Sequence, residues 1–396
     1  MTMAAAIESR NAGASGWSKS SRIAAVDIFA DIDQAETVWR SLENQHHLST
    51  PYQRFDFLRP WQQKVGTREG LKPLVVVAYD RDRVPLLLLP LVLKQGWGVR
   101  SAHFMGGKHA TFNMAIWNRD FAAVASRADL DVVFAAIQQR ESIDLLAFQQ
   151  QPLTWQDLPN PFALLPHQTS ANDCPVMTMV PGAAETTRIS HSMRQRLKTK
   201  ERKLKALPGY RYLLATSDAD VKRLLDAFFR IKPLRMAEQK LPNVFAEPGV
   251  EHFIRDACIT PRADGGRVIE IHALENDSEV IALFAGVADS YRFSMMFNTY
   301  TVSAVSRYSP GLILIRHIID HYAEHGYRTL DLGIGSDGYK KLFCKADEPI
   351  FDCFVPLGPR GSAAAIAMSA ANRSKRLVKR NPALLRLAQK LRRAFG

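Results

Sequence analysis

Two kinds of hydrophobic pattern alternate along this chain. Short apolar runs bounded by turn residues predict strands, which in the first half fall at residues 74–79, 84–94, 112–117, 143–148 and 175–179. Apolar positions three or four apart predict helices at 34–45 and 129–140. The turn between the first two strands, residues 80–83, is entirely charged, as expected of an exposed hairpin connection.

The second half repeats this order. The same patterns predict helices at residues 190–207, 218–232, 250–259 and 310–325, and strands at 210–215, 268–274, 280–288, 291–298, 328–332 and 351–357. Residues 339–343 fit a short helix or turn. Both halves therefore consist of helices, a strand meander, one more helix and one more strand. This order predicts an α+β (α/β) fold in which a mixed sheet flanked by helices occurs twice.

Composition suggests where the units begin and end. Residues 1–20 are rich in Ala, Ser and Gly, and we expect them to be disordered. The Pro-rich stretch 151–185 is the best candidate for a domain boundary. We therefore expect an N-terminal unit at 21–185, a C-terminal unit at 186–358 and a basic tail at 359–396.

The positive charge is concentrated in two segments. The 396 residues carry 52 Lys and Arg against 39 Asp and Glu, a net charge of +13. Residues 360–396 hold ten basic side chains and no acid, and residues 188–205 hold eight and one acid. The rest of the chain is slightly acidic. A nearly neutral body with two basic segments argues against a protein that wraps DNA.

Cysteine usage and hydropathy favour a cytoplasmic protein. The four cysteines form no CxxC pair, which fits reduced thiols and offers no zinc site. The longest strongly apolar run, 84–93, is half the length of a membrane-spanning helix. The N-terminus has no apolar core of a secretory signal. We expect no resident metal.

The segment Tyr-Ser-Pro-Gly-Leu at 308–312 begins the predicted helix 310–325. Ser309 is a good N-cap residue, and Pro310 suits the first helical position. Gly311 leaves the backbone N–H groups open to close approach. Such a helix start binds phosphate through its unsatisfied N–H groups, although it is equally explained as a well-made helix start.

A glycine-rich segment follows the next strand. Gly333, Gly335 and Gly338 spell GxGxxG, but no long helix and second strand can follow before Pro349, which excludes a Rossmann site. A Walker A loop is excluded too, because Tyr339 stands where its Lys belongs. The glycines instead predict a tight turn that presents Tyr339 and Lys340.

Together these segments resemble a known family. Tyr-Ser-Pro-Gly, a helix, the strand end Asp-Leu-Gly-x-Gly and then Tyr-Lys are similar to the BioF-like or cellulose biosynthesis protein D (CelD)-like acetyltransferases. These belong to the GNAT superfamily and are related to FemAB-type transferases. The resemblance covers residues 188–343 and is weaker over 25–150, where such proteins carry a degenerate first unit. It implies tandem GNAT-like units, with the active one C-terminal.

The resemblance implies acetyl-CoA or another acyl-CoA as the donor. In GNAT folds the helix start takes the donor's pyrophosphate, which would be met here by Ser309, Pro310, Gly311 and Leu312, with Arg307 nearby. Arg307 and Gly311 are one residue too far apart for the family's usual phosphate signature. Coenzyme A is therefore implied by the resemblance and not by the motif itself.

The resemblance also suggests catalytic residues. Residues 293–298 would line the thioester arm of the donor. Lys340 would stabilise developing charge or bind a phosphate of the acceptor, and Tyr339 would protonate the leaving thiolate. Asp331 or His272 would act as the base. Each also has a simpler structural explanation, as a turn cap, a surface lysine or a core histidine.

Two further sequence patterns each allow more than one interpretation. His317, Asp320 and His321 form HxxDH on the predicted helix, and we favour a solvated helix face over a metal site. The stretch 381–395 has an apolar stripe with basic flanks. It would lie on an anionic membrane surface, dock onto the protein itself or extend into solvent.

The resulting hypothesis is an acyltransferase. It would move an acetyl or other short acyl group from acyl-CoA to an amine or hydroxyl, by resemblance on a sugar or polysaccharide precursor in envelope or exopolysaccharide synthesis. One alternative is a FemAB-like transferase that uses aminoacyl-tRNA. Another is a non-catalytic accessory protein that docks a polysaccharide synthase at the inner face of the membrane.

Overall fold

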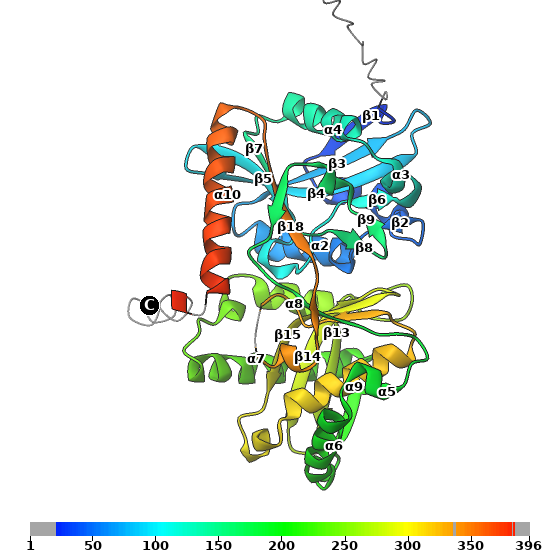
Figure 1. Ribbon diagram of the computed structural model, residues 1–396, viewed down its shortest axis with the longest axis vertical. Coiled ribbons are helices and arrows are strands. Elements are labelled where there is room, and N and C mark those ends of the chain that lie inside the picture. The colour runs from blue at the N-terminus through cyan, green and yellow to red at the C-terminus, as the bar shows by residue number, and fades with distance from the viewer. Residues whose placement is uncertain (1–20, 336–337, 382, 385–396) are drawn as a thin grey trace, which may run out of the picture.

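The computed structural model describes residues 21–335, 338–381 and 383–384, and Figure 1 shows two sheet-containing units stacked end to end. The first sheet has the strand order β1-β3-β4-β5-β7-β18-β10. These strands are Ala25–Phe29, Lys72–Tyr79, Pro85–Gly96, Val99–Phe104, Leu145–Pro152, Ile350–Pro356 and His167–Thr169. Two short strands, β2 (His47–Leu48) and β6 (Ile116–Asn118), pair beside β4.

The second sheet has the strand order β12-β13-β14-β15-β16-β11-β17. These strands are Arg211–Leu214, Glu270–Glu275, Val280–Ala288, Arg292–Tyr300, Thr329–Asp331, Pro175–Thr178 and Ala346–Asp347. Each sheet contains one parallel pair, β5 with β7 and β15 with β16, and its other pairs are antiparallel.

Both sheets follow the same plan. Three antiparallel strands (β3-β4-β5 and β13-β14-β15) precede a helix, α4 (Arg127–Arg140) or α9 (Pro310–Glu324). A strand parallel to the last of the three follows, and an antiparallel strand lies outside it. The predicted duplication of a mixed sheet with flanking helices is thereby confirmed.

The sheets do not divide the chain at the expected boundaries. Strand β11 lies within the predicted N-terminal unit but pairs with β16 of the second sheet. Strand β18 lies within the predicted C-terminal unit but pairs with β7 of the first. The chain thus passes between the units more than once, and the divisions at 185 and 358 do not correspond to the sheets.

Helices cover the second sheet on both faces. One face carries α7 (Asp218–Glu238) and α8 (Val250–Ile259), and the other carries α9, on which α6 (His191–Lys205) packs. In the first unit, α10 (Pro359–Arg380) crosses β5, β7 and β18, at the left of Figure 1. The remaining elements are short: α1 Glu36–Ser41, α2 Phe55–Trp61, α3 Arg119–Val124, α5 Glu185–Arg188, β8 Thr154–Trp155 and β9 Leu158–Pro159.

A continuous hydrophobic core joins the two units. It runs from the first sheet through α2 and α8 to the face of the second sheet that α7 and α8 cover. Phe57 of α2 meets Phe253 of α8 edge to face, with ring centroids 5.3 Å apart. Gly249, which precedes α8, approaches the backbone of Lys64 so closely that a Cβ there would lie 1.9 Å from the Lys64 carbonyl oxygen. The two units therefore form one packed body.

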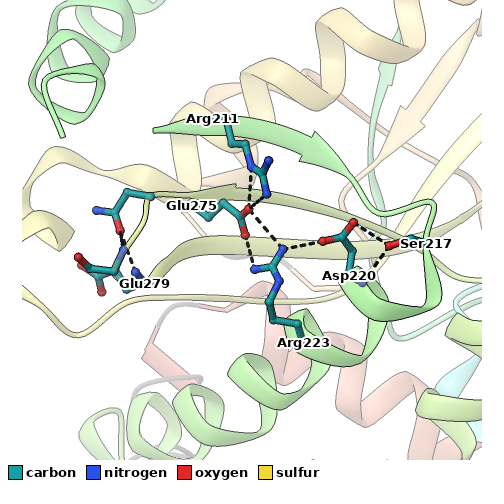
Figure 2. A network of polar contacts seen from close by, with 8 residues as sticks. Arg211, Ser217, Asp220, Arg223, Glu275 and Glu279 are labelled. Atoms are coloured by element: carbon teal, nitrogen blue, oxygen red, sulfur yellow. Dashed lines mark hydrogen bonds and ion pairs between the residues drawn. The ribbon is translucent and has the colours of Figure 1, made fainter. Parts of the chain in front are cut away.

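A buried carboxylate fastens the edge of the second sheet (Figure 2). Glu275 of β13 accepts hydrogen bonds from Arg211 of β12 (2.7 Å) and from Arg223 of α7 (2.5 Å). Arg223 also donates to Asp220, whose partner Ser217 caps α7. Because the side chain of Glu275 is only 5% exposed, these bonds replace lost hydration and link β12, β13 and α7.

The local differences from expectation are small. The predicted strand 112–117 is reduced to Ile116–Asn118, and the predicted helix 34–45 to a short 3₁₀ turn and α1. Within the described residues, no helix combines the length and apolarity that crossing a bilayer requires. The predicted amphipathic stretch 381–395 lies almost entirely outside the described residues.

Candidate active site

The two parallel strands of the second sheet separate soon after they meet. β15 and β16 pair at only three positions, the last of which joins Ser294 to Asp331. Beyond it, the register between β14 and β15 shifts, so that Met296 forms a β-bulge between Met295 and Phe297. A bulge bends its strand and takes a residue out of the ladder. The chain after β16 therefore diverges from β15 and leaves space between them.

A cavity of about 480 Å³ opens at this divergence. Its walls come from β15, from the segment after β16, from α8 and from loops of the first unit. The lining includes Met295, Met296, Phe297, Asn298, Leu332, Gly333, Ile334, Val250, Phe253, Ile254, Thr111, Gln150 and Asn172. Its volume falls in the range of small-ligand sites. Both units thus contribute to one cavity.

Tyr339 and Lys340 line this cavity, as the glycine-rich turn suggested. Gly333 and Gly335 have φ values of +74° and +112°, a region that glycine adopts without strain. Lys340 is more buried than expected, with 3% exposure. Its Nζ donates to the carbonyl oxygens of Gly333 (3.0 Å) and Ile334 (2.9 Å), so the lysine closes the turn and brings a cation to the cavity wall.

Asp331 lies directly behind that wall and is fully buried. Its carboxylate accepts hydrogen bonds from Ser294 Oγ (2.5 Å) and from the Gly333 N–H (3.0 Å). Burial raises the pKa of Asp331 to about 6, although the Arg292 charge and these two hydrogen bonds oppose the rise. Asp331 therefore holds the Gly333 backbone in place. It does not itself line the cavity.

An ion pair links β15 to the chain segment that precedes β18 and returns to the first sheet. Arg292 of β15 pairs with Glu348 at 2.5 Å, and both side chains are below 10% exposure. The guanidinium also lies over the Trp155 ring, 4.3 Å from its centroid. The chain segment that leads to β18 is thereby fixed beside the first residues of β15.

The structure places His272 away from the cavity. It is fully buried on the face of the sheet that α9 covers, whereas the cavity lies on the α8 side. Its ring nitrogens pair with the Tyr212 and Tyr322 hydroxyls, each at 2.9 Å. Burial, with the nearby His321, lowers the pKa of His272 to about 3. This histidine therefore stays neutral and packs as a core residue.

The start of α9 differs from the expected N-cap. Ser309 is left-handed, with φ of +58°, and its side chain caps no helix N–H. Its Oγ instead accepts a hydrogen bond from Lys200 Nζ of α6, at 2.7 Å. Pro310 occupies the first helical position as predicted. Arg307, one turn earlier, lies over the Tyr308 ring, 5.0 Å from its centroid.

This helix start lies near one end of the cavity. Tyr300, two residues after the cavity residue Asn298, is the neighbour that a Cβ on Gly311 would meet, at 3.7 Å. Lys232 of α7 donates to the Asn298 carbonyl (2.9 Å) and also lines the cavity. A ligand that spans Gly311 and the cavity would therefore run along the end of β15.

The HxxDH face of α9 is covered by α6 and is not solvated as expected. His317 pairs with Glu201 at 2.6 Å, and Asp320 accepts two hydrogen bonds from Arg194. Burial alone would raise the pKa of Glu201. The interactions with His317 and Arg316 outweigh this effect, so the pKa of Glu201 is lowered to about 2. No cluster of three metal-ligating side chains occurs within the described residues.

Sequence reasoning missed several residues at this site. Lys108 and Lys232 reach the cavity from different units, and Lys200 reaches Ser309. Only the charge of the segment 188–205 signalled Lys200 in advance. The bulge at Met296 has no signature in the sequence, since it depends on the register with β14.

Residues 191–341 match the family model described as "Acetyltransferase (GNAT) domain". This segment, which contains α6 to β16 and the turn with Lys340, is a GNAT acetyltransferase-like domain. The match does not extend to the first unit, and it does not single out the BioF-like or CelD-like family. No curated protein sequence matches the chain significantly.

Solved structures share the fold across both units. FemX aligns with a TM-score of 0.55 at 10% identity, over 82% of this chain and 96% of its own. The C-terminal domain of a putative lysylphosphatidylglycerol synthetase from Agrobacterium fabrum aligns with a TM-score of 0.50 at 12% identity, over 85% and 95%. A protein of unknown function from Bacteroides thetaiotaomicron gives 0.50 at 10% identity, over 84% and 100%. These similarities concern the fold alone.

Proposed function

We propose that this protein transfers an acetyl or other short acyl group from acyl-CoA to an amine or hydroxyl acceptor. The observation that carries the proposal is the cavity where β15 and β16 diverge, with Tyr339 and Lys340 in its wall. Most of its lining residues belong to the GNAT-like segment, and the strand that bulges at Met296 forms one of its walls. We place the reacting thioester there.

In this reaction the acceptor attacks the thioester carbonyl, a C–N or C–O bond forms and the C–S bond breaks. Negative charge develops on the carbonyl oxygen, and a preorganised cation such as Lys340 stabilises it. The leaving thiolate takes a proton, which we assign to Tyr339, and the proton that the acceptor amine or hydroxyl loses restores the Tyr339 hydroxyl. Asp331 acts from behind the wall, as the residue that positions the Gly333 backbone. His272 has no role in the step, because it lies on the other face of the sheet.

We place the phosphates of the donor at the start of α9. The free N–H end of the helix, Lys200 and Arg307 together supply positive charge there. Ser309 takes part through Lys200 rather than as a cap. Gly311 supplies a backbone N–H group, whereas the Leu312 N–H already donates to the Ser309 carbonyl oxygen at 3.1 Å. From this end, a pantetheine arm would follow β15 from Tyr300 to the cavity.

The charge of the cavity bears on the acceptor. Lys232 and Lys340 bring positive charge to it, Lys108 also lines it but pairs with Glu247, and no Asp or Glu is among its described lining residues. Such a site favours an acceptor with a negative group, for example a phosphorylated or nucleotide-linked sugar. This supports a polysaccharide or envelope precursor as the acceptor. We propose a cytoplasmic location, with residues 381–395 as a peripheral contact to the membrane.

The main alternative is a transferase that takes its acyl group from aminoacyl-tRNA. The observation that favours it is the fold shared with FemX over both units, together with the exposed basic residues of α6. A decayed transferase that serves as a scaffold for a polysaccharide synthase is the third candidate. It should bind no coenzyme A.

The decisive experiment is calorimetric titration of acetyl-CoA into the purified chain. We expect saturable binding that weakens about tenfold in Lys200→Met, because a charge-assisted hydrogen-bond donor is lost beside the helix start. Lys198→Met is the matched control, since it removes an exposed lysine two residues away on the same helix. Gly311→Leu, which fills the space beside Tyr300, should also weaken binding.

Absence of binding to the wild-type chain at millimolar acetyl-CoA would overturn the proposal. Aminoacyl-tRNA would then be titrated next. Equal loss in the Lys200 and Lys198 variants would instead show a nonspecific charge effect and remove the donor phosphates from the start of α9.

A further inference from the structure

A second large hollow lies on the first unit, and its described lining residues all fall outside the GNAT-like segment. It is a groove of about 860 Å³ between the hairpin of β4 and β5 and the first turns of α10. Its floor is apolar, formed by Val99, Leu145, Ala363, Ala364, Ala367 and Met368. Lys94 and Arg360 also line it, and no acid is among its described lining residues.

Trp97 stands at the tip of the hairpin beside this groove. Its side chain is fully exposed. Its φ of +54° is left-handed, and the following Gly98 has +71°. Such two-residue turns favour Asn or Gly, and a bulky residue there is strained. Packing within the fold does not compensate for this strain or for the exposed ring, so the position points to a contact outside the chain.

Further apolar side chains are exposed on α10, on the side of the helix that does not line the groove. Ile366 and Leu377 are 72% and 68% exposed and lie eleven residues apart, on the same side of the helix. The helix carries six basic residues and no acid: Arg360, Arg373, Lys375, Arg376, Lys379 and Arg380. Five of these basic residues lie within four positions of Leu377, so the positive charge gathers at the C-terminal end of the helix.

We propose that this hairpin–α10 surface, defined by Trp97, Ile366, Leu377, Lys94 and Arg360, docks onto an anionic lipid bilayer. Tryptophan places its ring at the boundary between headgroups and acyl chains, where one part is apolar and the other wet. Basic side chains around apolar ones are attracted to acidic headgroups. The surface is defined without residues 381–395, and the proposal does not depend on the transferase activity.

The test is sedimentation of the full chain with vesicles of phosphatidylcholine alone or mixed with phosphatidylglycerol. We expect binding to the mixed vesicles only, and a roughly tenfold weaker partition constant for Trp97→Ser. Leu241→Ser is the matched control, because Leu241 is an exposed apolar residue (52%) in the other unit. That variant should bind as the wild type does.

Fluorescence gives a second readout. Of the six tryptophans, four (Trp39, Trp61, Trp117 and Trp155) are fully buried and Trp17 lies outside the described residues. A blue shift on adding mixed vesicles that is absent in Trp97→Phe therefore locates Trp97 at the bilayer. Unchanged partitioning of Trp97→Ser would overturn the proposal, as would equal binding to neutral vesicles. Self-association of the wild type that Trp97→Ser abolishes, without vesicle binding, would assign the surface to a second copy of the chain instead.

Discussion

The junction between the units can be tested with two matched glycine substitutions. Gly249 and Gly265 have almost the same φ, +86° and +84°. They differ in their surroundings. A Cβ at position 265 meets nothing within 4 Å, whereas a Cβ at 249 lies 1.9 Å from the Lys64 carbonyl oxygen. Replacing each with alanine therefore separates the cost of the conformation from the cost of the contact.

The expected magnitudes follow from these two terms. In Gly265→Ala the only cost in stability comes from placing a residue with a Cβ in the left-handed conformation, about 1 kcal/mol. Gly249→Ala has the same conformational cost. In addition, α8 must move until the distance between the new Cβ and the Lys64 carbonyl oxygen rises from 1.9 Å to more than 3.0 Å. Overpacking of this kind costs about 1–3 kcal/mol. We therefore expect a loss of about 1 kcal/mol for Gly265→Ala and of about 2–4 kcal/mol for Gly249→Ala.

The assay is urea unfolding followed by fluorescence, with the free energy compared at equal slope. A second readout is acetyl-CoA binding, since α8 contributes Val250, Phe253 and Ile254 to the cavity wall. Gly249→Ala should lower affinity, and Gly265→Ala should leave it unchanged. If both variants lose the same stability, the close approach of α8 to Lys64 does not hold the units together and this reasoning fails.

Two predictions concern pH. Asp331, with a pKa near 6, is ionised above that pH and then accepts the Gly333 N–H most strongly, so transfer activity should fall below pH 6. Asp331→Asn, which cannot titrate, should remove this acidic limb from the pH–rate profile, and an unchanged limb would exclude Asp331 as its source. His272, with a folded pKa near 3 against 6.5 unfolded, favours the unfolded state once protons bind. Stability is therefore fully present above pH 6.5 and should fall by up to ~1.4 kcal/mol per unit as pH drops towards 3, with a shallower slope in His272→Gln.

The strands and helices of the second unit were largely predictable from sequence. The helix Val250–Ile259 and the strand Val280–Ala288 have the predicted bounds, because each is an apolar pattern ended by turn residues or polar residues. Pairing partners were not predictable. Nothing in the periodicity of β11 or β18 says which sheet each joins, because that choice depends on contacts between residues far apart in sequence.

The positions of the candidate site residues were likewise only partly predictable from sequence. The tight turn before Tyr339 and Lys340 was predictable, because glycines mark such a turn locally. His272 was misplaced because its role depends on which face of β13 meets Tyr322, which alternation alone does not decide. Ser309 was expected to cap α9, but Lys200 from another helix holds its hydroxyl. Tertiary contacts, rather than local preference, decided both positions.

Because β11 and β18 cross between the two sheets, the first unit contributes to the cavity of the proposed active site. Strand β11 supports β16 from the outside, and the loop after β16 forms one wall of the cavity. Lys108, Thr111, Gln150 and Asn172 of the first unit form another wall. A cavity built from both units keeps its shape only while their shared core is intact. A change in the core of the first unit should therefore alter the cavity as well, even though the family match is confined to the second unit.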